Sequence, residues 1–382
     1  MSCKLTVDIE EGTQVYRLGG FHPVYIGDVF NDRYKVLNRI GYGVYSTVWL
    51  VEDLESTQLE NKYRALKILR ADCYDGKDAP IFEREILTHF RNGDREQLGY
   101  KHVCHLLDDF EHRGPNGTHV CLVLELMGET LLSFGTWFLE CRIPNSVMRN
   151  IKPDNIFVKF RDYSLIESGY LVEVAIPQQD KSEEQYSVIP LSPLYCYYFN
   201  EADKTRVAEF DIALGDWGVS SWADQHLTEL IQPVALRSPE VLIQAPWGAR
   251  TDWWNLGSII LELFQAVRMF SGLVPPDGHY ELKEHLAEIV DLSGPFPREL
   301  LEQGNQDIVR DLFDEDGRIK DYPPMGRPGL SSEEFLSGLD QSVRVEFASF
   351  LHTMMKINPK DRISAEDLLR HPWLGALPPN DD

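Results

Sequence analysis

The sequence is short of cysteine and of long apolar runs, and each shortage excludes a class of protein. Its six cysteines are scattered without a Cys-x-x-Cys pair, so we expect neither a disulfide framework nor a zinc module. The most apolar segment, LGSIILELFQAV, is short and contains Glu262, and the first residues, MSCKLTVDIEEGTQ, lack the apolar core of a signal peptide. We therefore expect no membrane span and no export signal, and predict a soluble intracellular protein.

Basic residues are scarce relative to acidic ones. The chain has 37 lysines and arginines against 61 aspartates and glutamates, a formal net charge of −24. Such a surface repels nucleic acid and anionic membranes, so we expect neither as a partner. The charge favours basic partners, although it can equally serve solubility alone. The nearest approach to a metal cluster, KHVCHLL, places its ligands on opposite sides of a predicted strand, and we expect no metal there.

The sequence does contain enough apolar material for two lobes, with 382 residues of which 43% are hydrophobic. Residues 34–127 combine short β-type runs with one amphipathic helix, PIFEREILTHFR, whereas helical spacing dominates from residue 216 onward. A polar stretch with proline and serine, IPQQDKSEEQYSVIPLSPL, predicts a surface insertion at about residues 161–208. We predict an α+β fold with a nucleotide held between a small β lobe (34–127) and a large helical lobe (128–375), flanked by an extension (1–33) and a tail (376–382).

A glycine turn and a lysine suggest phosphate binding. The segment IGYGVYSTVWL places Gly41 and Gly43 between two predicted strands, where main-chain N–H groups can lie against phosphates. Lys67, in the strand RALKIL, would contact those phosphates, and Glu85, in the helix segment EREIL, would hold the lysine. Taken singly, these features are a tight turn, a strand lysine and a solvated glutamate. Their order and spacing favour the functional interpretation.

Two further motifs supply oxygen ligands. The segments NIKPDNIFV and ALGDWGVSSW place Asn155 and Asp216 at the edges of apolar runs. Two such ligands suit Mg²⁺, which keeps several waters and bridges phosphates. Lys152 would then point at the transferred phosphate. Taken alone, Asp216 could instead belong to an ordinary surface turn.

Together these motifs resemble the eukaryotic protein-kinase domain. The segment YRLGGFHPVYIGDVFNDRYKVLNRIGYGVYSTVWL is further similar to the opening segment of the SR-protein kinases, which phosphorylate serines in Arg/Ser-rich splicing factors. The resemblance implies ATP and Mg²⁺ as cofactors, basic Arg/Ser-rich proteins as substrates, and a monomer of the cytoplasm and nucleus. It also implies a hinge at Glu125–Met127, with Leu124 guarding the pocket behind it. The residues that the resemblance assigns to ATP binding are Ile40, Gly41, Gly43, Val48, Ala65, Lys67, Glu85, Leu124, Glu125 and Met127.

One part of the kinase pattern is absent. The segment SVMR runs directly into NIKPDN, so the central helix of the large lobe and the His-x-Asp catalytic segment are missing together. Asn150 stands in place of the catalytic aspartate, and because a carboxamide cannot take a proton, the loss of this base should cost about 10²–10⁴-fold in rate. If the absent helix buries about six apolar side chains, the deficit is on the order of 10 kcal/mol, and a large lobe without this helix should not fold normally. We therefore predict impaired phosphoryl transfer.

Several explanations of this gap stay open. The chain could be a mis-spliced or mis-predicted product of a normal kinase gene, or an impaired kinase or isoform. It could also be a pseudokinase that binds Arg/Ser-rich proteins without turning over ATP. A small-molecule kinase of related fold is a further alternative, against which the opening segment and the motif RSPEV count.

Overall fold

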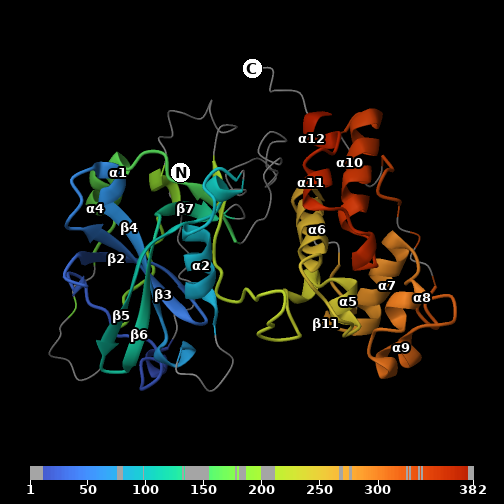
Figure 1. Ribbon diagram of the computed structural model, residues 1–382, viewed down its shortest axis with the longest axis horizontal. Helices are drawn as coiled ribbons and strands as arrows, with labels where there is room; N and C mark the ends of the chain where they lie inside the picture. Colours follow the sequence, from blue (N-terminus) through green and yellow to red (C-terminus); the bar gives the residue numbers. More distant parts are fainter. Residues whose placement is uncertain are drawn as a thin grey trace. The chain divides into compact units, whose positions relative to one another are not determined.

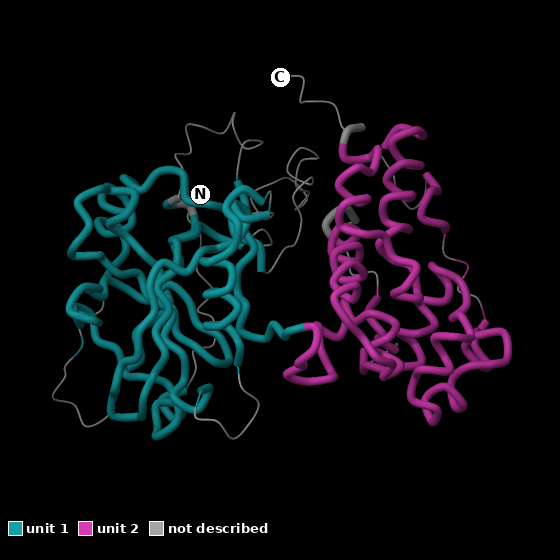
Figure 2. The backbone as a smooth tube through the Cα atoms, in the orientation of Figure 1, with its two compact units in different colours: residues 1–134, 154–222 teal, residues 135–153, 223–382 magenta. Residues whose placement is uncertain are grey.

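The computed structural model describes most of the chain as two compact units (Figure 2). Unit 1 contains residues 1–134 and 154–222, and unit 2 contains residues 135–153 and 223–382. The described residues are 12–74, 81–97, 99–130, 133, 155–176, 179, 186–198, 211–265, 270–274, 278–323, 326, 328–333, 336 and 339–376.

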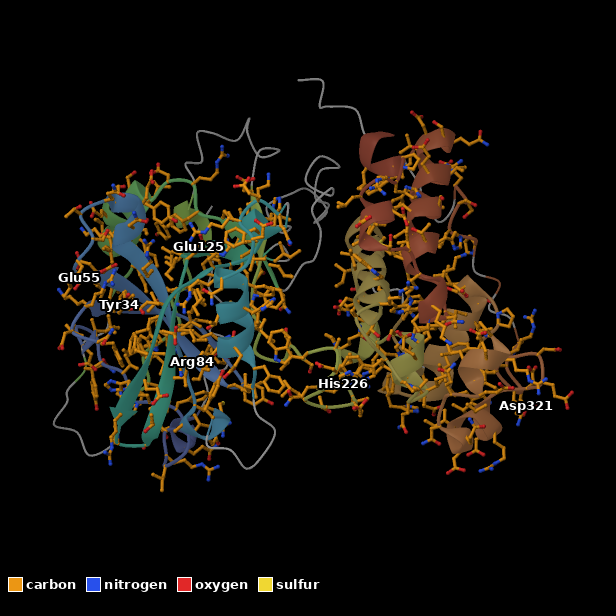
Figure 3. The ribbon with its side chains drawn as sticks, in the orientation of Figure 1. Tyr34, Glu55, Arg84, Glu125, His226 and Asp321 are labelled. Atoms are coloured by element: carbon orange, nitrogen blue, oxygen red, sulfur yellow. The ribbon has the colours of Figure 1, made fainter. Side chains whose placement is uncertain are left out.

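Unit 1 is built on a six-stranded antiparallel sheet (Figure 1). Alternating side chains give each central strand one buried face, and Val36, Trp49 and Leu66 meet there in a common core. Tyr34, which opens the second strand (Figure 3), donates its hydroxyl to Asp108 at 2.8 Å. The strands lie in the order β1 (Val29–Phe30), β2 (Tyr34–Gly43), β3 (Ser46–Asp53), β4 (Tyr63–Leu69), β6 (Gly117–Leu124) and β5 (Leu106–Gly114).

Helix α2 (Glu83–Arg91) packs on this sheet. Its residue Leu87 is buried in a cluster with Leu69 and Leu122 of the strands. Because residues three and four apart share a helix face, the positions that precede Ile86 and Leu87 by one turn also face the sheet. The short helices of this part of the chain are η1 (Thr13–Val15), α1 (Leu59–Lys62), η2 (Ala71–Cys73) and η3 (Tyr100–His102).

A second, three-stranded sheet completes unit 1. It consists of β7 (Met127–Thr130), β8 (Ile156–Lys159) and β9 (Ile212–Leu214), with β8 in the middle. The connection between β8 and β9 contains the predicted insertion. Its described parts include a π-helical turn η5 (Ile166–Tyr170), the short helix α4 (Leu171–Glu173) and η6 (Tyr195–Tyr198).

Unit 2 is mainly helical. A core around Trp254, Phe347 and Leu351 holds its helices together, and a buried ion pair joins Glu240 to Arg362 with 2.6 Å between Oε2 and Nη2. Its elements are η8 (Val234–Leu236), α5 (Pro239–Leu242), α6 (Thr251–Gln265), β10 (Leu273–Val274), β11 (His279–Tyr280), α7 (Leu282–Ser293), α8 (Arg298–Leu301), α9 (Gln306–Leu312), α10 (Gln341–Met354), η9 (Pro359–Asp361), α11 (Ala365–Leu368) and α12 (Trp373–Ala376).

The predicted α+β fold, an antiparallel sheet carrying a helix followed by a helical region, is confirmed. The two compact units divide the chain elsewhere than at the predicted limit after residue 127, since β8 and β9 fall in unit 1. The predicted domain limits therefore stay a prediction. Among the described helices, none combines the length and the apolar character that a bilayer crossing requires.

Candidate functional site

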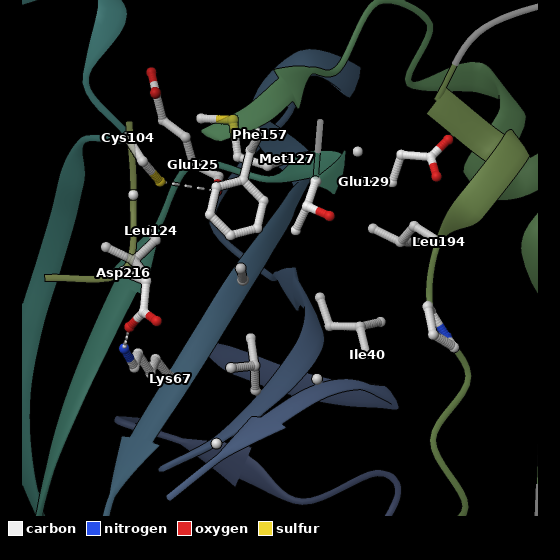
Figure 4. Close-up of a pocket in the computed structure, with 18 of the residues that line it drawn as sticks. Ile40, Lys67, Cys104, Leu124, Glu125, Met127, Glu129, Phe157, Leu194 and Asp216 are labelled. Carbon is white, nitrogen blue, oxygen red and sulfur yellow. Dashed lines mark hydrogen bonds and ion pairs between the residues drawn. The ribbon is translucent and has the colours of Figure 1, made fainter. Parts of the chain in front are cut away.

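Unit 1 contains a cavity of about 420 Å³. Figure 4 shows side chains from both sheets converging on it, with Lys67 and Asp216 at one end and Leu194 at the other. Ten of the residues predicted to bind ATP or metal line this cavity: Ile40, Gly41, Gly43, Val48, Ala65, Lys67, Leu124, Glu125, Met127 and Asp216. Of the remaining predicted residues, Glu85 and Asn155 do not line it, and Asn150 and Lys152 lie outside the described residues.

The glycine turn forms the wall of the cavity at the β2–β3 hairpin. Gly41 pairs with Val48, and Gly43 pairs with Ser46. A Cβ atom at position 41 would lie 3.3 Å from the Cβ of Val48, a contact tighter than packing normally allows. The glycine thus keeps the backbone of this wall uncovered, so that main-chain groups can approach a ligand.

Lys67 is the cationic centre of the cavity. It lies on β4 and is 8% exposed. Its Nζ donates to Oε1 of Glu83 at 2.6 Å and to Oδ1 of Asp216 at 3.1 Å. Burial opposes its positive charge, but the two carboxylates outweigh burial and hold the pKa of Lys67 above its ordinary value. A charged ammonium is therefore fixed at this end of the cavity.

The predicted partner of Lys67 was wrong. Glu83, and not Glu85, pairs with the lysine. The two glutamates are two positions apart on α2, which turns them about 200° away from each other. Glu85 is exposed and accepts a hydrogen bond from the hydroxyl of Tyr74 at 3.3 Å, whereas Glu83 is 1% exposed. The signal was in the sequence, because Glu83 precedes the apolar Ile86 and Leu87 by one helical turn.

Asp216 and Asn155 are brought together by the pairing of β8 with β9. The main-chain N–H of Gly215 donates to the carbonyl oxygen of Asn155 at 2.8 Å. Asn155 therefore lies beside the residue that immediately precedes Asp216. Asp216 has a positive φ of 55°, a left-handed conformation that is uncommon for non-glycine residues and that aspartate and asparagine adopt more readily than most. An aspartate and an asparagine are oxygen donors that fit Mg²⁺, which needs few protein ligands.

Away from Lys67 the cavity wall combines apolar side chains with the polar Glu129, Thr130 and Ser133. Ala65 and Leu124 pair across β4 and β6, and the N–H of Glu125 donates to the carbonyl of His105 at 3.1 Å. This arrangement suits a flat, weakly polar group at one end and a charged one at the other.

Sequence reasoning missed several lining residues of this part of the cavity. Phe157 of β8 and Cys104 lie beside Met127, as Figure 4 shows. Burial raises the pKa of the Cys104 thiol to about 12, so it packs as an apolar side chain and is no nucleophile. Leu194 and Tyr195 of the insertion also line the cavity. The apolar run IFV could have indicated a buried strand that contains Phe157, but the insertion carried no comparable pattern.

Comparison with known proteins adds independent evidence. The protein kinase domain model matches residues 202–374. A serine/threonine protein kinase of Aspergillus fumigatus is 30% identical over 379 residues, which cover 96% of this chain and 91% of the relative. Protein kinase dsk1 of Schizosaccharomyces pombe is 27% identical, covering 96% of this chain and 85% of the relative. The serine/threonine-protein kinase SRPK of Physarum polycephalum is 25% identical, covering 97% and 92%.

Proposed function

Because this chain belongs to the serine/threonine protein kinases, within the SR-protein-kinase family, we propose that it binds ATP with Mg²⁺ in the cavity of unit 1 and transfers the γ-phosphoryl group to serines of Arg/Ser-rich proteins. One observation carries this proposal above the others. Lys67 is tied to Glu83 and Asp216 at the end of a glycine-walled cavity. This arrangement provides a fixed cation for phosphate beside a carboxylate for a metal.

Each end of the cavity has a separate role in this proposal. The backbone of Gly41 and Gly43 covers the phosphates, and the ammonium of Lys67 contacts them while Glu83 holds it in place. Ile40, Val48, Ala65 and Met127 offer apolar contact to the adenine base, with Leu124 guarding the space behind it.

The hinge residues Glu125–Met127 follow β6, and Glu125 and Met127 line the cavity, where the main chain of the hinge would recognise the edge of the base. Asp216 and Asn155 would hold Mg²⁺, which when bound neutralises charge on the phosphates. Lys152 would steady the transferring group, although its position lies outside the described residues.

Basic Arg/Ser-rich proteins fit this chain on charge. The net charge of −24 produces a potential that attracts and orients cationic peptides, mainly by raising the association rate. In the reaction, the serine oxygen forms a bond to the γ-phosphorus, the bond from that phosphorus to the β,γ-bridging oxygen breaks, and ADP leaves. The serine hydroxyl also loses its proton, which normally requires a base.

Asn150 limits the rate at this last step. An asparagine can orient the serine hydroxyl but accepts no proton, so we infer a transfer rate lower by about 10²–10⁴-fold than with an aspartate. The same residue favours the second candidate function, a pseudokinase that binds Arg/Ser-rich proteins without transferring phosphate. Nucleotide binding is common to the enzyme and to a nucleotide-binding form of the pseudokinase, so only phosphate transfer separates them.

Radiolabelled ATP and an Arg/Ser peptide test the proposal on the full chain. We expect slow incorporation of phosphate by the natural chain and none by Lys67→Ala. Lys62→Ala serves as the matched control, because Lys62 pairs with Glu167 on the surface of unit 1 and should leave incorporation unchanged. Asn150→Asp should raise the rate. Peptide binding without incorporation, in both the natural chain and Asn150→Asp, would establish the pseudokinase instead.

A further inference from the structure

Part of the predicted insertion lies along β2 and reaches the cavity. We call residues 189–195 the strap. At one end of the strap, Ile189 is 1% exposed and packs in the core of the six-stranded sheet with Val36 and Trp49. At the other end, Pro193, Leu194 and Tyr195 line the cavity. The strap therefore connects the core of the small sheet to the wall of the proposed nucleotide site.

The strap makes two hydrogen bonds to one residue, Arg39, one to its side chain and one to its main chain. The Nη1 atom of Arg39 donates to the carbonyl of Ile189 at 3.0 Å, and the carbonyl of Arg39 accepts from the N–H of Ser192 at 2.9 Å. Arg39 is fully buried and lies two residues before Gly41. Hydrogen bonds to a buried charged group contribute more than neutral ones, so the strap is held firmly against the strand that leads into the glycine turn.

Further hydrogen bonds within the insertion also hold the strap. The hydroxyl of Tyr170, a fully buried residue of η5, donates to the carbonyl of Ser192 at 2.6 Å. The N–H of Tyr197 donates to the carbonyl of Leu194 at 2.8 Å, and the Tyr197 hydroxyl donates to Glu173 at 2.8 Å. Hydrogen bonds from β2 and from the rest of the insertion thus fix the backbone that presents Leu194, which is 4% exposed.

We propose that the strap sets the width of the cavity at the end away from Lys67, and that Leu194 and Tyr195 thereby determine which nucleotides the site accepts. Figure 4 shows Leu194 near Ile40 and Glu129, facing into the cavity, at the end opposite Lys67 and Asp216. With phosphates at Lys67, the nucleoside lies at the strap. This inference deepens the proposed function and rests on it, because it assumes that the cavity holds ATP.

The test compares ATP with 2′/3′-O-(N-methylanthraniloyl)-ATP, which carries a bulky fluorescent group on its ribose. Affinities of the full chain for both are measured by fluorescence titration and by competition with ATP. Leu194→Ala widens the cavity at the strap and should shift the preference toward the bulky nucleotide by about tenfold or more, the scale of discrimination in apolar pockets. Val172→Ala, in the same insertion but 73% exposed, is the matched control and should leave the preference unchanged.

A second variant protects the test against misfolding. Tyr195 is 37% exposed, so Tyr195→Ala removes a cavity wall without opening the core and should shift the preference in the same direction. Thermal unfolding of each variant verifies its fold. An unchanged ratio of the two affinities in both strap variants, with both nucleotides bound by the natural chain, would overturn the role of the strap alone. Failure of the natural chain to bind either nucleotide would overturn the proposed function and the strap with it.

Discussion

The pairing of Lys67 with Glu83 predicts a sharp difference between two neighbouring glutamates. The side chains of Lys67 and Glu83 are 10% and 2% exposed, and removing one partner of a buried pair costs about 3–5 kcal/mol. Asp216 remains 3.1 Å from the lysine, so Glu83→Ala should lie near the lower end, at about 3 kcal/mol of unfolding free energy. Glu85→Ala removes one exposed hydrogen bond to Tyr74 and should cost less than about 1 kcal/mol.

The same substitutions should separate in nucleotide affinity. Without Glu83, the ammonium of Lys67 is held by Asp216 alone and is displaced from the phosphate site, so ATP affinity should fall by about 10–100-fold, or 1.4–2.8 kcal/mol. Glu83→Gln keeps the size of the side chain and one acceptor, and should give an intermediate loss. Urea unfolding followed by tryptophan fluorescence, with calorimetric titration of ATP, measures both quantities. Equal losses in Glu83→Ala and Glu85→Ala would refute the assignment of Glu83.

Two further predictions concern stability. Arg362→Ala leaves Glu240 buried without its cation and should lower the unfolding free energy of unit 2 by about 3–5 kcal/mol. The control, Arg298→Ala, breaks an exposed pair with Glu302 and should cost at most about 0.5 kcal/mol. Similar losses of unfolding free energy in the two variants would contradict the role of the buried pair. Burial and two neighbouring histidines lower the pKa of His22 to about 3. The unfolded chain takes up this proton near pH 6.5, so stability should fall between pH 6.5 and 3, by about 2 kcal/mol at pH 5 relative to pH 7.5. His22→Phe should reduce this pH dependence in urea titrations, and an unaltered dependence would sink the explanation.

Much of unit 1 was predictable because its signals are local. The segment RALKIL surrounds Lys67 with apolar residues, and the structure places Lys67 on β4 with its side chain buried in the cavity. Glu83 was missed because two acidic residues compete in one short segment, and only the helical phase relative to the apolar residues distinguishes them. Residue types alone thus predict the helix correctly, but the helical phase is needed to choose between its two glutamates.

The strap could not be predicted for a different reason. Its contact with Arg39 joins residues 150 positions apart in the sequence, and the two prolines of its sequence, IPLSPLY, interrupt any regular helical or strand-like run. Its apolar residues Ile189, Leu191, Leu194 and Tyr195 follow neither a helical nor a strand-like period throughout. The contact between the strap and β2 depends on a buried arginine and on main-chain carbonyls. Because every residue has a main-chain carbonyl, the sequence does not indicate which one will accept the hydrogen bond. Such contacts are established by the tertiary fold and leave little trace in local sequence.

The position of the cavity bears on the missing catalytic segment. Every described residue that lines the cavity belongs to unit 1, whereas the absent helix and the His-x-Asp motif would precede Ile151 in the chain. The contacts that hold Lys67, Glu83 and Asp216 together also lie within unit 1. Under the proposed function, nucleotide binding would therefore depend on parts of the chain that are present, and the gap would affect the later step in which serine gives up its proton. Affinity for ATP and the rate of phosphate transfer should accordingly separate in this protein, with the first retained and the second impaired.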